Sequence, residues 1–573
     1  KRIIKMEKAE RGYFFLKTSE APVGTRYRYR FDEKTELPDP ASRYQPEGPH
    51  GPSEVVPTTF AWTDRAWSGL DLKDLVIYEL HVGTFTEQGT FAGVREKIPH
   101  LKKLGINAIE IMPVAQFAGG RNWGYDGVGL FAPQNTYGSP GAVAAEEMKA
   151  LVNECHANGI AVILDVVYNH LGPEGNYLPQ LGNYFQSKYK TPWGDALNYD
   201  GEDSDEVRNY FLQNARQWFE DFHLDGLRLD AVHAIFDTSA YPFLAELADL
   251  KQSLEKKLSR SLFLIAESDA SDPRILKSTE DGGHGMDGHW ADDLHHVVHT
   301  LLTKEKHHYY ADYGEPEQLV KVLKNAMLFE GEYSPFRRRR HGRSYNNVDR
   351  RRLMVCSQNH DQIGNRKDGE RLIAIAGAEK QKMAAACVLL SGALPMIFMG
   401  EEFAETAPFQ YFVDHTDKDL LEAVRKGRKA EFASSQWEGE APDPASADTF
   451  RRSKLDWQRV GTDPQAAEFQ AYYRRLIELS KWIRATGFYR SEDLKVEIPP
   501  GQKRVEISAT KNGEVLKIYM SYGDQPQKIP SSGVTNLEIA LNSSENDGSN
   551  SSAKVLTETL DLKPFGVIVL RSR

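Results

Sequence analysis

Short apolar runs alternate with stretches of helical periodicity between about residue 75 and residue 483. Eight runs have the length of a strand, at residues 76–82, 108–113, 161–168, 226–232, 262–267, 286–290, 353–358 and 396–399. Nearly continuous apolar runs of this kind are typical of strands buried on both faces of a parallel sheet. Eight parallel strands separated by helices predict an α/β fold, the (β/α)8 TIM barrel.

The stretches between the runs carry the helical pattern. Met148, Leu151, Val152 and Cys155 have the i, i+3, i+4, i+7 spacing of one apolar helix face. Similar patterns predict helices over residues 94–104, 204–222 and 464–483. The longest connection, residues 171–203, follows the third strand and is rich in Gly, Pro, Asn and aromatic residues, which suits an active-site loop.

Both ends of the chain have a different, β-rich pattern. Residues 26–31 alternate polar and aromatic side chains, and we expect residues 1–70 to form a partial N-terminal β-sandwich whose sequence looks truncated. Residues 505–508, 515–519 and 565–570 predict a C-terminal antiparallel β-sandwich with a mobile loop at 542–552. The predicted division is therefore 1–70, a catalytic barrel at 71–490, and 491–573.

Composition narrows the possible partners. The chain has 573 residues, too many for one hydrophobic core. Its net charge of -11 and its pI near 5.9 argue against nucleic acid as a partner. We interpret the run of four arginines at 337–340 as a solvated loop or an ion-pair network. No apolar run reaches the ~18 residues of a membrane span. The three cysteines lie in apolar stretches, which favours a reducing, cytoplasmic location.

Acidic residues follow several of the predicted strands, at the barrel end where active sites form. Asp230 lies near the end of the fourth run, Glu267 ends the fifth and Asp361 follows the seventh. Arg228 and Asp230 are two residues apart, so they point to one side of a strand, and the arginine favours the ionised carboxylate. A single carboxylate at a strand end is more often a helix cap or an ion-pair partner. Three at three strand ends favour catalysis.

Four segments, at residues 165–170, 226–230, 264–267 and 358–361, resemble in order and spacing the four signature regions of the α-amylase clan of glycoside hydrolases. The resemblance implies a retaining hydrolase in which Asp230 is the nucleophile, Glu267 the general acid and base, and Asp361 a third acid that binds sugar hydroxyls. It also implies that four residues surround the cleaved sugar, namely Tyr125, His170, Arg228 and His360. No cofactor is implied, and without an acidic cluster of calcium-binding spacing we predict no required metal.

Further segments, at residues 172–178, 290–296, 358–365, 400–403 and 408–415, resemble the malto-oligosyltrehalose trehalohydrolase family. That family hydrolyses the α-1,4 bond next to a terminal trehalose unit and releases trehalose and maltodextrin. The resemblance implies malto-oligosyltrehalose synthase as a functional partner. We expect Trp290, Asp292 and Asp293 to contact the trehalose end.

Three alternatives stay open at this point. A glycogen branching enzyme would transfer glucan chains, and a maltogenic or debranching amylase would act on other glucosidic bonds. A non-catalytic relative would keep the barrel as a scaffold, but such relatives characteristically lose the three acids that this chain keeps.

Overall fold

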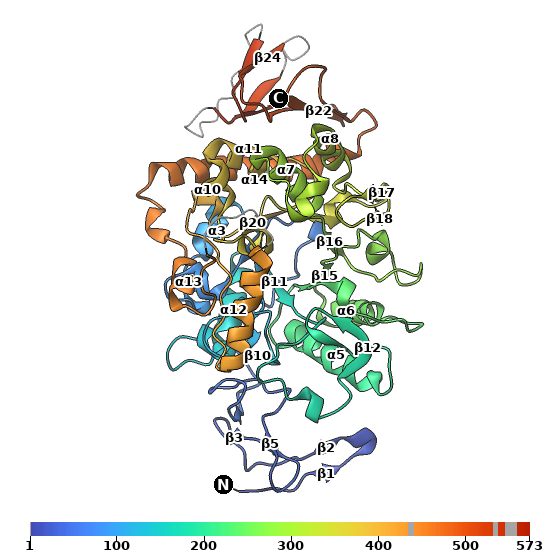
Figure 1. The fold of residues 1–573 in the computed structure, drawn as a ribbon, viewed down its shortest axis with the longest axis vertical. Coiled ribbons are helices and arrows are strands. Elements are labelled where there is room, and N and C mark those ends of the chain that lie inside the picture. Colours follow the sequence, from blue (N-terminus) through green and yellow to red (C-terminus); the bar gives the residue numbers. More distant parts are fainter. Residues whose placement is uncertain (1, 434–439, 531–536, 545–558, 573) are drawn as a thin grey trace.

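The computed structural model describes residues 2–433, 440–530, 537–544 and 559–572. Most of the predicted mobile loop at 542–552 lies outside these ranges. The molecule is elongated, with a helix-covered barrel in the middle, the N-terminal segment at one end and the C-terminal strands at the other (Figure 1).

Eight parallel strands close into a barrel, one in each predicted run, which confirms the predicted fold. The closed order is β7-β8-β11-β14-β15-β16-β19-β20, and every neighbouring pair is parallel. The strands are β7 Ile77–Leu80, β8 Ala108–Ile111, β11 Ala161–Val166, β14 Gly226–Leu229, β15 Phe263–Ala266, β16 Gly288–Trp290, β19 Leu353–Val355 and β20 Leu394–Phe398.

The inside of the barrel has an apolar part and a charged part. Alternate residues of each strand point inward. The first inward residues, among them Ile77, Ala108 and Ile163, belong to an apolar cluster. The next inward positions have ionisable side chains and are buried: Glu79, Glu110, Asp165 and Arg228. A layer of ionisable side chains thus lies between the apolar cluster and the mouth of the barrel.

Helices cover the barrel, and those predicted over 94–104, 204–222 and 464–483 are present as α2 with α3, α5 and α14. The helices are α1 Val82–Phe85, α2 Phe91–Arg95, α3 Ile98–Leu104, α4 Ala144–Ala157, α5 Ser204–Glu220, α6 Phe243–Leu258, α7 Asp293–Thr303, α8 Pro316–Asn325, α9 His360–Gly364, α10 Leu372–Ala376, α11 Ala378–Leu389, α12 Lys418–Ala433, α13 Ala447–Arg452 and α14 Pro464–Thr486.

Long connections carry three antiparallel pairs of strands beside the barrel. The predicted loop at 171–203 holds β12 (Phe185–Thr191) and β13 (Gly194–Leu197), which form a hairpin. The other pairs are β9 (Ala115–Gln116) with β10 (Gly129–Pro133), and β17 (Glu330–Ser334) with β18 (Arg339–Gly342). In the arginine run, Arg337 forms an ion pair with Asp269, as the ion-pair interpretation expects.

The N-terminal segment contains short strands that pair two by two. The pairs are β1 (Glu7–Lys8) with β2 (Phe14–Phe15), β3 (Arg26–Tyr27) with β6 (Ser53–Glu54), and β4 (Tyr29–Arg30) with β5 (Glu36–Leu37). The predicted region boundaries near residues 70 and 490 stay a prediction.

The C-terminal region is an antiparallel sandwich, as predicted. One sheet has the order β21-β22-β23-β27-β25 and the other pairs β24 with β26. Leu570 of β27 packs with Ile529 and Leu562 of the small sheet, while Val569 joins the core shared with the barrel helices. The strands are β21 Lys495–Glu497, β22 Arg504–Lys511, β23 Glu514–Ser521, β24 Gln527–Pro530, β25 Glu538–Asn542, β26 Thr559–Leu562 and β27 Val567–Arg571.

Among the described residues, we find no helix with the length and apolar character needed to cross a membrane.

Candidate active site

Two of the three predicted catalytic acids contact the same arginine, Arg228. Asp230 directly follows β14 and Glu267 directly follows β15, which are neighbouring strands. Arg228 Nη1 donates to Asp230 Oδ1 at 2.9 Å, and its Nη2 lies 3.0 Å from Glu267 Oε2. The two carboxylates therefore face each other across a single guanidinium group.

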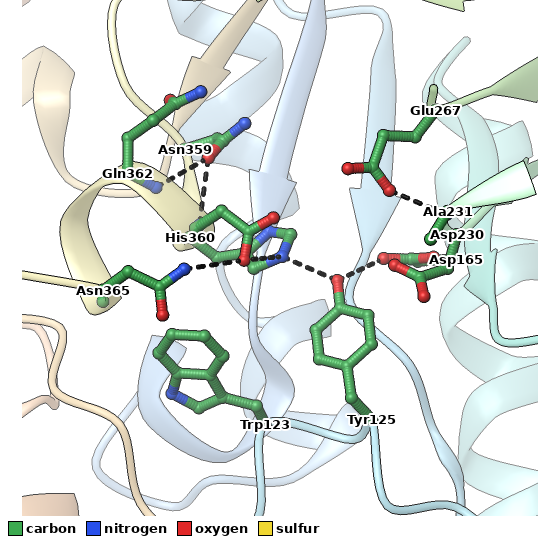
Figure 2. A network of polar contacts seen from close by, with 12 residues as sticks. Trp123, Tyr125, Asp165, Asp230, Ala231, Glu267, Asn359, His360, Gln362 and Asn365 are labelled. Carbon is green, nitrogen blue, oxygen red and sulfur yellow. Dashed lines mark hydrogen bonds and ion pairs between the residues drawn. The ribbon is translucent and has the colours of Figure 1, made fainter. Parts of the chain in front are cut away.

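The backbone after Asp230 also holds the Glu267 carboxylate. Ala231 has a φ of 38°, a left-handed conformation that costs a non-glycine residue about 1–3 kcal/mol. Its amide N–H donates to Glu267 Oε2 at 2.8 Å, as Figure 2 shows. The strained turn therefore ties the position of Glu267 to that of Asp230.

Arg228 is fully buried and is fixed from two further sides. Its Nη1 lies 2.8 Å from both carboxylate oxygens of Asp165, the residue opposite it on β11. Its guanidinium carbon lies 4.1 Å from the centroid of the Trp290 ring. Trp290 is only 3 % exposed and belongs to the apolar cluster inside the barrel, where it packs against Arg228. The expectation that Trp290 binds substrate stays a prediction.

Asp361, the third predicted acid, lies in the first turn of α9 at the edge of the site. Asn359 caps this helix, since its side-chain oxygen accepts the amide hydrogens of Asp361 at 2.9 Å and Gln362 at 3.1 Å. The side chain of Asp361 is 43 % exposed, and its Oδ1 lies 3.5 Å from His360 Nε2. An open carboxylate held on a capped helix is free to contact a ligand.

Tyr125 and His360 lie at the base of the site, between the acidic side chains. The Tyr125 hydroxyl donates to Asp165 Oδ2 at 2.6 Å and lies 2.7 Å from His360 Nε2 (Figure 2). The two rings stack with centroids 5.2 Å apart. Gly124 permits the turn before Tyr125, because its φ is +106° and a Cβ there would come within 2.1 Å of the Pro113 carbonyl oxygen.

His360 is charged in spite of its burial. Burial disfavours the imidazolium, but Asp361 and Glu79 outweigh it and raise the pKa of His360 to about 10. Glu79 Oε1 accepts from His360 Nδ1 at 2.5 Å. His360 Nε2 then donates to Tyr125, and Tyr125 in turn donates to Asp165.

His170, also predicted, lies on the other side of Tyr125. Its Nε2 donates to the Tyr125 carbonyl oxygen at 2.9 Å, and burial lowers its pKa, so the ring is neutral. The half-exposed Trp193, at the turn of the β12–β13 hairpin, stacks on His170 with ring centroids 4.1 Å apart. The hairpin thereby brings an exposed aromatic face to the mouth of the barrel.

Asp292 and Asp293 are adjacent in sequence, but their side chains have different hydrogen-bond partners. Asp292 accepts from Gln362 Nε2 at 3.3 Å, and burial together with the charges of Glu267 and Asp361 raises its pKa to about 8. Asp293 instead accepts from the Tyr313 hydroxyl at 2.8 Å and the Leu328 amide at 2.6 Å. Both of its oxygens order the chain after α7, and the expectation that Asp293 contacts substrate stays a prediction.

The sequence interpretation missed Glu79 and Trp193. Glu79 stands inside an apolar run that must be buried, and an acid in such a run is a signal of a polar network. Trp193 lies in the predicted active-site loop but in no recognised motif. Within the ranges described above, no group of three or more His, Cys, Asp or Glu side chains is arranged to hold a metal ion.

Comparison with known proteins identifies the family of the chain. The α-amylase catalytic domain model matches residues 54–195. A crystal structure of a provisionally named α-amylase from Salmonella typhimurium superimposes with a TM-score of 0.88 and 34 % identity, covering 99 % of this chain and 94 % of that one. The protein is a glycoside hydrolase of the α-amylase family.

Two curated relatives narrow this class. A malto-oligosyltrehalose trehalohydrolase of Saccharolobus solfataricus is 48 % identical over 84 % of this chain and 81 % of its own length. One from Mycobacterium tuberculosis is 41 % identical over 90 % of this chain and 88 % of its own. The chain belongs to the malto-oligosyltrehalose trehalohydrolase family.

Proposed function

We propose that this protein hydrolyses the α-1,4-glucosidic bond next to the terminal trehalose unit of malto-oligosyltrehalose and releases trehalose and a shortened maltodextrin. The names of its curated relatives support this substrate over the branching-enzyme and debranching alternatives. The observation that carries the chemistry is the sharing of Arg228 by Asp230 and Glu267.

In the first step, Asp230 attacks the anomeric carbon while Glu267 donates its proton to the departing glucosidic oxygen. Arg228 Nη1 holds the attacking carboxylate of Asp230 in place through its 2.9 Å contact with Oδ1. This step releases trehalose, which carries the departing oxygen, and leaves the maltodextrin chain bound to Asp230 as a covalent glycosyl-enzyme. In the second step Glu267 takes a proton from water, which attacks the same carbon and frees Asp230.

The remaining residues bind the sugar around this centre. Asp361, exposed at the edge of the site, would accept hydrogen bonds from hydroxyls of the cleaved glucose and stabilise positive charge in the transition state. Tyr125 and His170 would lie against its ring. Asp292 would meet the trehalose end, since a protonated carboxyl can both donate to and accept from sugar hydroxyls.

The test compares maltopentaose with malto-oligosyltrehalose of equal chain length. We expect a higher kcat/KM for the trehalose-ended chain, with trehalose as a product, and at least a ~1000-fold loss of kcat in Asp230→Asn with correct folding. New α-1,6 branches or equal rates on both sugars would overturn the substrate assignment. Full activity of Asp230→Asn would overturn the mechanism.

Two further assignments complete the proposal. The enzyme that makes trehalose-ended chains, a malto-oligosyltrehalose synthase, would supply the substrate. Cys155, Cys356 and Cys387 are all buried and free, which supports a reducing cytoplasm as the working compartment.

A further inference from the structure

We propose that Glu79 is a positioning residue for the reaction, holding His360 doubly protonated so that the His360–Tyr125–Asp165–Arg228 chain of hydrogen bonds orients Asp230. This inference rests on the proposed function, in which Asp230 is the nucleophile. Glu79 touches neither the acids nor the open side of the site.

The geometry of Glu79 is that of a dedicated partner. It lies on β7, is 1 % exposed, and its two oxygens engage one residue. Oε1 accepts from His360 Nδ1 at 2.5 Å, and Oε2 accepts from the His360 amide at 3.2 Å. The side chain therefore fixes both the ring and the start of α9, the helix that carries Asp361.

The hydrogen bonds that lead from Glu79 to Arg228 need one particular arrangement of protons. With Nδ1–H given to Glu79, Nε2–H can be given to the Tyr125 oxygen at 2.7 Å only if the ring carries both protons. Tyr125 then has its hydroxyl hydrogen free for Asp165 at 2.6 Å, and Asp165 binds Arg228 at 2.8 Å. Above the pKa of Asp165, which burial raises to about 7, neutral His360 would leave one of these contacts without its proton.

Several other titratable groups face the His360 ring. Besides Glu79 they are Tyr125 and Asp361 beside it and, from the surrounding strands, His81, Glu110, Asp165 and Arg228. Burial lowers the pKa of His81, so that ring adds no positive charge. Asp361 also favours the imidazolium, but it lies at the exposed edge of the site. Glu79 is the carboxylate in direct contact with Nδ1.

Glu110 provides a matched control. It pairs with Glu79 across β7 and β8, and it is equally buried. Burial, reinforced by the charge of Glu79, raises the pKa of Glu110 well above its usual range, so it is neutral. Neither of its oxygens has a hydrogen-bond partner among the described residues. Glu110→Gln exchanges one neutral group for another of the same shape.

The experiment measures kcat at saturating substrate from pH 6 to 9.5 for wild type, Glu79→Gln and Glu110→Gln. Without the Glu79 charge, His360 loses its proton at lower pH. If its pKa returns toward the ordinary value of about 6.5, kcat falls about tenfold between pH 6 and pH 7.5. Glu110→Gln follows the wild-type profile. A Glu79→Gln profile parallel to wild type, or the same shift in Glu110→Gln, overturns the proposal.

Two further measurements keep the proposal testable if Glu79→Gln folds poorly or if the substrate is not the one proposed. Glu79→Asp keeps the charge, so it should lower kcat while retaining the wild-type pH profile; a shifted profile would count against the proposal. Nitrogen NMR of labelled histidines, with His360 assigned through His360→Gln, should show a charged ring at pH 8 in wild type and a neutral one in Glu79→Gln. Because the ring charge is read without substrate, a failed trehalose assignment remains distinguishable from a failed role for Glu79.

Discussion

At the scale of single residues, the charge of Asp292 is the feature most open to test. This carboxyl lies near Glu267 and Asp361, and its pKa of about 8 keeps it protonated at neutral pH. As pH rises through 8 it loses its proton and can no longer donate a hydrogen bond to a sugar hydroxyl. We therefore expect KM for the trehalose-ended chain to rise above pH 8 in wild type.

Asp292→Asn is neutral at every pH and serves as the matched variant. Its KM should stay flat from pH 6.5 to 9.5, with kcat at pH 6.5 within about threefold of wild type, because it preserves the shape of the protonated acid. Steady-state kinetics across that range decide the matter. An alkaline rise of KM in the variant equal to that in wild type would show that another group titrates.

The residue scale also shows where sequence interpretation stops. Asp230, Glu267 and Asp361 could be found because each ends or follows an apolar run, and strand order in a barrel brings such ends together. Asp292 and Asp293 could not be separated, since neighbouring residues at a helix start point about 100° apart and sequence does not fix the rotation. Glu79 was hidden because its partner, His360, lies 281 residues away in sequence.

At the scale of elements, a buried cluster joins the segment before the barrel to its N-terminal end. His156 of α4 lies between Asp64 at 2.8 Å and Asp225 at 3.0 Å, and the Trp67 indole donates to Asp225 at 2.7 Å. His223 also contacts Asp64 at 2.8 Å. Asp64 thus links the approach to β7 with α4 and with the turn before β14.

Asp64→Asn should destabilise the fold in a pH-dependent manner. Burial opposes ionisation of Asp64, but hydrogen bonds from His156 and His223 lower its pKa to about 2. A lowered pKa stabilises the folded state above the unfolded value near 4, and this stabilisation is lost as pH falls toward 2. We expect a deficit of about 1–2 kcal/mol in the free energy of unfolding at pH 6, reduced by solvent screening.

Urea unfolding at pH 6 and pH 2.5 measures this deficit. It should shrink at the lower pH, where wild-type Asp64 begins to lose its charge. Asp524→Asn removes a carboxylate that is 70 % exposed, and should change stability by less than about 0.5 kcal/mol at either pH. A deficit in Asp64→Asn that is equal at both pH values would assign the effect to shape instead of charge.

Elements were predicted better than their connections for a physical reason. A strand buried on both faces must be apolar, so its run is visible in sequence, and all eight barrel strands lie where the pattern placed them. The hairpin β12–β13 has no such run. Its strands are only partly buried, and its position depends on side-chain contacts such as those of Asp200 with Tyr189 at 3.0 Å and Thr238 at 2.7 Å.

At the scale of the whole molecule, the C-terminal sandwich and the barrel share one core. Figure 1 shows α11 and α14 between the barrel and the C-terminal strands. Ile518 of β23 and Val569 of β27 belong to the same apolar cluster as Leu476 of α14, and Arg475 Nε donates to the Ala540 carbonyl oxygen at 2.8 Å. Apolar surface buried between two parts couples their unfolding, because separating them exposes it to water.

We therefore expect Val569→Ala to weaken the active site from a distance. Val569 has no exposed surface, and truncating it should cost about 1–3 kcal/mol through lost burial and the cavity left behind. If the core is shared, the temperature at which catalytic activity is lost falls by a few degrees, although the substitution is far from Asp230 in the fold.

Lys528→Ala on β24 removes only an exposed ion pair with Asp561, so it should leave that temperature within error of wild type. Thermal inactivation followed by residual hydrolysis distinguishes the two cases. Loss of C-terminal structure in Val569→Ala with an unchanged inactivation temperature would mean that the barrel is stable without the sandwich.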